Sequence, residues 1–202
     1  MNAMAIPCTM ATGMAVGTFT NTETIFLLRN PEHFALSQEM TGQVANDIIF
    51  YSVIMMMVST LCIGYVYELC GRKWTIVINA LISGFFMFLV PLAPNLNWLI
   101  FFRMGMAFAL VAPMCQPLVN DYVKKTSRGQ AVAFQGLGLI IGDLFTFLVL
   151  FNIIKGMTYY ESFSVATTFV VIMAVVILFL VKEPNMKKLH RQSASSSNVI
   201  VE

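Results

Sequence analysis

Five apolar stretches, each long enough to cross a membrane as a helix, dominate the sequence. They cover residues 48–67, 74–93, 98–119, 131–154 and 163–181. The hydrocarbon core of a bilayer is about 30 Å thick, and a helix of roughly 20 mainly apolar residues crosses it. The sequence therefore predicts a series of membrane-spanning helices.

The composition excludes the common classes of soluble protein. Of the 202 residues, 58% are apolar and 11% are charged, whereas a soluble domain has about 45–50% apolar and about 25% charged residues. The formal net charge is only +2, with no long block of one sign, which argues against a nucleic-acid partner. The four cysteines form no C-x-x-C pair, so they are typical of packing residues rather than of a metal or disulfide site. We expect an integral membrane protein whose first partner is the lipid bilayer, with no metal and no cofactor.

The first 22 residues carry no charge but are only mildly apolar, because they are rich in threonine, methionine and glycine. We interpret residues 3–20 as a weak or shortened first span. The alternative is a signal peptide, but the segment lacks the basic start and the compact apolar centre of one. Six spans are expected, and five are the alternative.

Lysine and arginine are distributed unevenly between the loops, and basic residues resist translocation. The loops after the second and fourth spans and the C-terminal tail hold nine of them: Arg72, Lys73, Lys124, Lys125, Arg128, Lys182, Lys187, Lys188 and Arg191. The other loops hold only Arg29 and Lys155. This asymmetry predicts cytoplasmic termini and an outer loop over residues 23–47. Residues 1–182 would form the membrane domain, and residues 183–202 a flexible cytoplasmic tail or the start of a central loop.

The loop after the second span has a distinctive spacing of glycines and charges: Gly64, Glu68, Gly71, Arg72 and Lys73. Gly64 and Glu68 are one turn apart on the same helix face. Gly71 provides a permissive backbone where the helix ends. Arg72 and Lys73 can bond the free carbonyls of the helix end and favour its negative dipole end.

This loop resembles the signature of the major facilitator superfamily, G-x-x-x-D-x-x-G-R-R/K, with Glu68 in place of the usual aspartate. Arg103 followed by Gly105, and Asp121 in the next cytoplasmic loop, are similar to the family's fourth helix and its exit. The resemblance covers about residues 48–184. It implies an all-α bundle of six transmembrane helices, the N-terminal half of a transporter that works by alternating access around a central site. The partner of this half would be a second six-helix half or a second copy of the chain.

The resemblance also implies roles for the charged residues of the cytoplasmic loops. In such transporters the loop acid and arginine belong to a charge cluster that latches the inward gate. Carried over, the gating motif would comprise Gly64, Glu68, Gly71, Arg72, Lys73 and Asp121. The alternative is ordinary charge pairing at helix ends, worth about 0–1 kcal/mol when exposed.

Arg103 and Asp143 are the ionisable residues that lie well inside the predicted spans. A charge inside a membrane costs about 2.5–3.5 kcal/mol on insertion scales, so such a residue indicates a functional site. At 1.5 Å per residue, the two lie roughly 10 and 12 Å below the outer boundary of the core. We expect them to pair or to share one aqueous cavity and to take part in substrate or proton coupling. The alternative is a static pair that locks two helices.

The fifth span carries Gly138 and Gly142 directly before Asp143. Many antiporters of the family have G-x-x-x-G-P here, so an aspartate in the proline position favours proton coupling. Small residues spaced by four also let helices approach closely, and packing alone would explain these glycines. In the family, helices one, two, four and five border the cavity, and the polar residues of this chain divide in the same way.

The motifs of common enzymes are absent, since the sequence contains no H-E-x-x-H, G-x-S-x-G or P-loop pattern. We therefore expect no enzymatic activity. The favoured function is transport of a small solute, and the alternative is a truncated, non-transporting subunit that binds a relative. The sequence does not identify the solute, although Arg103 slightly favours an anionic one.

Overall fold

The computed structural model describes residues 4–114 and 127–181, which form an all-helical bundle. The helices are α1 (Ala5–Arg29), α2 (Gln38–Cys70), α3 (Arg72–Leu89), α4 (Leu96–Met114), α6 (Arg128–Phe145) and α8 (Tyr159–Leu180). A 3-10 turn, η1 (Val90–Leu92), extends α3, and a π-helical segment, η3 (Thr146–Leu150), joins α6 to α7 (Phe151–Ile153). Counted with α6, η3 and α7 as one continuous helix, the described part of the chain contains six long helices. This confirms the predicted bundle of six helices.

The predicted apolar stretches correspond to α2, α3 with η1, α4, α6 with α7, and α8. Four of these rods are long and apolar enough to span a membrane, and α4 contains a shorter apolar segment, Leu96–Ala112. Residues 115–119 of the predicted third apolar stretch lie outside the described residues, as does the predicted tail. The chain is therefore an integral, multi-pass membrane protein.

The bounds predicted for a weak or shortened first span, residues 3–20, are wrong, because α1 is a helix of 25 residues. Its weak apolar character is as predicted, since α1 is not among the helices apolar enough to span a membrane by composition. The predicted outer loop over residues 23–47 is also wrong, since the connection from α1 to α2 covers only residues 30–37. Ser37 begins α2 as its N-cap and accepts a hydrogen bond from the backbone of Met40 at 3.4 Å.

The polar residues of α1 explain both errors. Threonine hydroxyls along the helix donate to carbonyls of the preceding turn, for example Thr12 to Cys8 at 2.8 Å and Thr20 to Val16 at 2.7 Å. These bonds satisfy the hydroxyls locally, so a helix of low apolarity can be buried. In α1, 14 of the 25 residues are buried, compared with six of 33 in α2.

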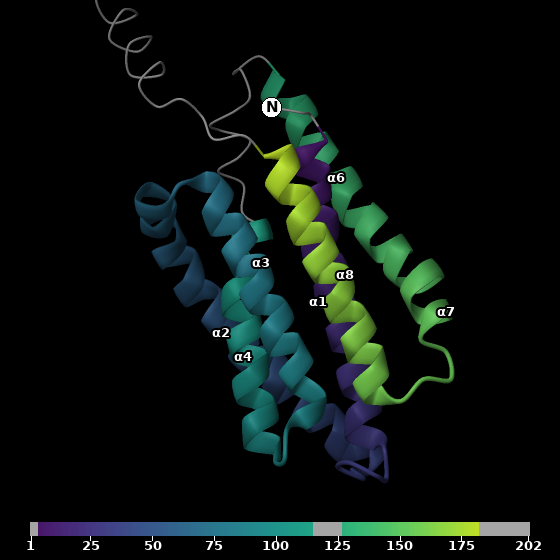
Figure 1. The fold of residues 1–202 in the computed structure, drawn as a ribbon. Helices are drawn as coiled ribbons and strands as arrows, with labels where there is room; N and C mark the ends of the chain where they lie inside the picture. The colour runs from purple at the N-terminus through teal and green to yellow at the C-terminus, as the bar shows by residue number, and fades with distance from the viewer. Residues whose placement is uncertain (1–3, 115–126, 182–202) are drawn as a thin grey trace, which may run out of the picture.

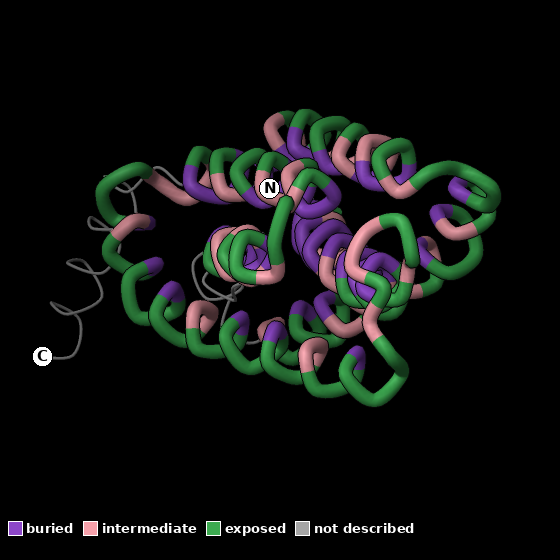
Figure 2. Tube along the Cα trace, turned by 90° about the horizontal axis from the view of Figure 1, so that it is seen from below, coloured by how far each residue is buried: buried purple, intermediate pink, exposed green. Residues whose placement is uncertain are grey.

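The helices form two groups around this buried rod. Figure 1 shows α2, α3 and α4 on one side and α1, α6 and α8 on the other. The groups meet where α1 packs against α4 and where α3 packs against α8. In the view along the bundle, buried residues face inward and exposed residues line the outer sides of the helices (Figure 2). The start of α1, the α2–α3 turn and the end of α8 lie at one end of the bundle (Figure 1).

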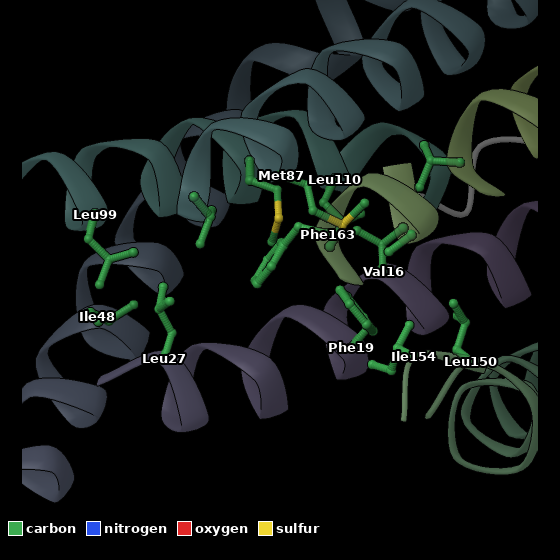
Figure 3. Packing of buried hydrophobic residues seen from close by; sticks show 14 of the residues in the cluster. Val16, Phe19, Leu27, Ile48, Met87, Leu99, Leu110, Leu150, Ile154 and Phe163 are labelled. Carbon is green, nitrogen blue, oxygen red and sulfur yellow. The ribbon is translucent and has the colours of Figure 1, made fainter. Parts of the chain in front are cut away.

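The main apolar core lies where these two groups meet. Phe19 of α1 packs edge-on against Phe163 of α8, with ring centroids 5.4 Å apart, and both side chains are fully buried. Met87 of α3 and Leu110 of α4 belong to the same cluster, as Figure 3 shows. The core therefore ties α1 to three of its neighbours and fixes its position.

The closest helix approach is between α1 and α6, and it depends on glycine. A Cβ atom at Gly138 would lie 2.6 Å from the carbonyl oxygen of Pro7, and one at Gly142 would collide with the backbone of Ala11. The two glycines are one turn apart and face the same helix. Packing between helices thus accounts for them, as the alternative interpretation of the sequence proposed.

Candidate functional site

A cavity of about 250 Å³ opens between α1, α2 and α4. Its lining is mostly apolar or small, with Thr18 and Asn21 from α1, Ser52 from α2 and Arg103 from α4 as the polar members. Three of the four helices expected to border a cavity do so, whereas α6 contributes none of the lining residues. Arg103 supplies the one charge among these lining residues.

Arg103 is held deep inside the bundle, with 3% of its surface exposed. Its Nη2 donates a hydrogen bond to Oδ1 of Asn21, and its Nη1 lies 4.0 Å from the sulfur of Met106. Its Nε has no hydrogen-bond partner in the part of the chain that the structure describes. Within the described residues, no carboxylate pairs with this guanidinium.

Asp143 of α6 is half-buried and accepts a hydrogen bond from the hydroxyl of Thr18 at 2.5 Å. It is not among the residues that line the cavity, but Thr18 is. The π-helical segment η3 begins three residues later, and such segments are frequent at functional sites.

The sequence predicts that Arg103 and Asp143 pair or share one cavity; among the described residues they do not pair, and Asp143 does not line the cavity that Arg103 lines. Consecutive position in the sequence suggested that α4 and α6 are adjacent, but α1 packs against both and separates them. Each charge is instead bonded to α1, at Asn21 and Thr18, which are three residues or about 4.5 Å apart along the helix axis.

Sequence reasoning missed Thr18 and Asn21 because they belong to the helix that was interpreted as weak. A signal was nevertheless present, since uncharged polar residues are concentrated in this stretch more than in any other span. In a membrane helix, such residues indicate a protein-facing or cavity-facing surface rather than a lipid-facing one.

Ser52 of α2 is a further polar residue that sequence reasoning missed. Its side chain is 8% exposed and lines the cavity, yet its Oγ has no hydrogen-bond partner. Buried hydroxyls are normally hydrogen-bonded, so an unpartnered one beside a cavity indicates a place where a ligand can bind.

The predicted gating motif forms the turn between α2 and α3. Gly71 has φ +81°, which favours glycine, and it lets α3 begin directly after α2 ends. The guanidinium of Arg72 lies 5.1 Å from the ring centroid of Tyr67, whose hydroxyl donates to the carbonyl of Ala112 at 2.7 Å. Arg72 is thereby connected to α4 through Tyr67, another residue that sequence reasoning missed.

The remaining members of the motif are only partly described. Glu68 and Gly64 are exposed, and Lys73 is half-buried. Asp121 lies outside the described residues. The charge cluster of Glu68, Arg72 and Asp121 therefore stays a prediction.

A second cavity of about 220 Å³ lies at the opposite end of the bundle from this turn. Glu23 of α1 lines it together with Lys155, Tyr159 and Ser162. Glu23 is 7% exposed as a residue, and its carboxylate forms no hydrogen bond or ion pair with any described residue. The described residues contain no cluster of three or more potential metal ligands, here or elsewhere.

Comparison with known families agrees with the helical bundle and the motif at the α2–α3 turn. The family model described as Major Facilitator Superfamily matches residues 4–200, almost the whole sequence. No curated protein and no solved structure matches the chain. Members of this family move small solutes across membranes, and the chain belongs to the major facilitator superfamily.

Proposed function

We propose that this chain transports a small solute by alternating access and supplies one six-helix half of the transporter. The observation that carries the proposal is the bonding of both membrane-embedded charges, Arg103 and Asp143, to one central helix. Charges at this depth are costly, and they are retained mainly on substrate, ion and proton pathways.

The arrangement supports a coupling mechanism through α1. A solute that binds Arg103 competes with Asn21 for the guanidinium and weakens the contact between α4 and α1. Protonation of Asp143 removes the charge that attracts the hydroxyl of Thr18 and weakens the contact between α6 and α1. Because Thr18 and Asn21 lie within one turn of the same helix, a shift of α1 that follows solute binding at Arg103 also alters the contact of Asp143 with Thr18, and the reverse holds.

The α2–α3 turn would act as the cytoplasmic gate in this proposal. Arg72 stacks on Tyr67, and Tyr67 holds the backbone of α4, the helix that carries Arg103. Opening of a latch formed by Glu68, Arg72 and Asp121 would thus be transmitted along α4 to the cavity. This assignment places the turn and both termini in the cytoplasm.

The partner in this proposal is a second six-helix half or a second copy of the chain. Transporters of this type bind solute between two halves, and the cavity between α1, α2 and α4 is the part that this half would contribute. The alternative function is a non-transporting subunit that associates with a relative and regulates it.

The test measures uptake of labelled sugars, amino acids and carboxylates by cells that produce the chain. Arg103→Ala and Asp143→Asn are expected to abolish uptake while the protein still reaches the membrane. Glu39→Gln, which removes an exposed charge in the first turn of α2, is the matched control and should leave uptake unchanged. Normal uptake by both site variants would exclude coupling through these charges.

The two functions also differ in assembly. Light scattering of the purified chain in mild detergent, corrected for the detergent, gives its oligomeric state. A stable dimer supports a transporter of two halves. Association with a twelve-helix relative, together with indifference to Arg103→Ala and Asp143→Asn, would instead establish the regulatory subunit.

A further inference from the structure

We propose that the cavity between α1, α2 and α4 binds a short organic anion by its carboxylate, with Arg103 as the counter-charge. This inference rests on the proposed function, because it names the class of solute for the same site. Three properties of the cavity support it: its single charged residue, its hydrogen-bond donors and its apolar lining.

The charge balance of the cavity is one-sided. Arg103 is the single charged residue among the described residues that line it, and no described carboxylate forms an ion pair with the guanidinium. Asp143 is not among the lining residues and accepts a hydrogen bond from Thr18, and Glu23 lines the other cavity. An uncompensated buried charge costs several kcal/mol, and a bound anion would remove that cost.

The donors around the cavity suit a carboxylate better than a spherical ion. A guanidinium presents five N–H donors in a planar fork that matches the two oxygens of a carboxylate. Among the described residues, Asn21 supplies the one oxygen acceptor for the Arg103 guanidinium, and Nε has no partner there. Ser52 of α2, whose hydroxyl has no partner among the described residues, lines the same cavity and is a further donor.

The other walls favour an apolar and small remainder of the ligand. Ile49, Val53, Met56, Met106 and Leu110 give the cavity a largely hydrocarbon surface. Gly13 and Gly17 leave room along α1. The volume of about 250 Å³ is below the roughly 300–1,000 Å³ of sites that enclose drug-sized ligands. A short aliphatic carboxylate such as butyrate fits this description, and a sugar, which needs many hydrogen-bonding partners, does not.

The experiment measures the thermal stability of the purified chain in dodecyl maltoside with butyrate, butyramide or chloride. Butyramide has almost the same shape as butyrate but no charge, and chloride has the charge without the apolar body. A ligand that binds only the folded state raises its unfolding temperature. We expect a concentration-dependent rise with butyrate, and none with butyramide or chloride at the same concentration.

Two variants locate the effect. Arg103→Gln removes the charge and should weaken butyrate binding at least tenfold. That variant also changes a buried residue and could reduce stability by itself, so Asn21→Asp is the second test. It places a carboxylate beside the guanidinium of Arg103. The protein should therefore fold with normal stability but lose the response to butyrate. Thr22→Val, which changes the same helix without touching the cavity, should respond like the unaltered chain.

Each contrary result overturns the inference. An equal response to butyramide would mean that the apolar walls bind the ligand, and an equal response to chloride would mean a site for any anion. A response that survives in Asn21→Asp would place the ligand elsewhere, and no response at all would exclude short carboxylates. Arg103-dependent uptake of a neutral solute would refute the solute class but leave transport intact, whereas butyrate binding without any uptake would refute transport alone.

Discussion

Arg103 of α4 donates a hydrogen bond to Asn21 of α1, and both residues line the cavity. It joins the helix that carries the buried positive charge to the most enclosed helix of the bundle. The same turn region of α1 also holds Asp143 through Thr18. The stability of the bundle and the chemistry of its cavity therefore depend on the same few polar contacts.

Asn21→Leu is expected to destabilise the chain by about 2 kcal/mol, because hydrogen bonds to charged groups contribute roughly 1.5–3 kcal/mol and the guanidinium would lose its oxygen acceptor. Thermal unfolding in detergent measures the effect. Thr22→Val is the control, since it removes a hydroxyl that bonds only within α1. Equal unfolding temperatures for the two variants would mean that Asn21 does not stabilise Arg103.

Gly142→Ala should disrupt the contact between α1 and α6, because the new methyl group would collide with the backbone of Ala11. Overpacking of this kind costs typically 1–3 kcal/mol, and backbone cannot move aside as a flexible side chain can. The yield of monodisperse protein in size-exclusion chromatography and the unfolding temperature should both fall.

Gly136→Ala is the matched control for this prediction. It lies on the same helix, and a Cβ atom there meets nothing within 4 Å. Alanine should leave the chain as stable as before or slightly more stable, because glycine is the poorer helix former. Similar losses for both variants would show that α6 does not pack on α1 through Gly142.

The apolar stretches predicted five of the six helices because hydropathy reports the surface that a helix shows to lipid. It failed for α1, which other helices surround and whose threonine hydroxyls are bonded internally. A helix in that position needs little apolar surface, so its sequence resembles a weak span. The loop boundaries near Glu23 were wrong for the same reason, since a buried glutamate was interpreted as the start of a loop.

The two membrane charges could be identified from the sequence because their cost makes them rare. Their partners could not, because the spatial order of helices is set by packing and not by chain order. Gly142 fits α6 against α1, and this placement separates Asp143 from Arg103. The unpartnered hydroxyl of Ser52 carries no sequence signal, since a serine in an apolar helix is commonly bonded to its own backbone.

Tyr67→Phe should reduce stability by about 1 kcal/mol, because it removes the hydrogen bond to Ala112 but keeps the ring beneath Arg72. Tyr67→Leu removes both contacts and should cost more, since a cation over an aromatic ring contributes about 0.5–1 kcal/mol at exposed sites. Unfolding temperatures of the two variants give the difference. An equal loss for both would mean that the ring does not hold Arg72.

Gly71→Ala should also destabilise the α2–α3 turn, by about 1–2 kcal/mol, because its φ of +81° is unfavourable for a residue with a Cβ atom. Gly64→Ala, in the same motif but inside α2 with nothing within 4 Å of an added Cβ, is the control. If Gly64→Ala is as damaging as Gly71→Ala in thermal unfolding, the turn does not require the left-handed backbone.

Glu23→Gln should stabilise the chain by about 1 kcal/mol, because a buried carboxylate without a hydrogen bond or ion pair among the described residues is costly to keep charged. The amide keeps the shape of the side chain and removes the charge from the cavity that Lys155 and Tyr159 also line. Glu32→Gln, at an exposed position in the connection between α1 and α2, should leave the unfolding temperature unchanged. A lower unfolding temperature for Glu23→Gln would show instead that the negative charge is balanced in the folded chain. Lys155 is the cation among the lining residues of that cavity. Lys155→Gln should then lower the unfolding temperature in the same way.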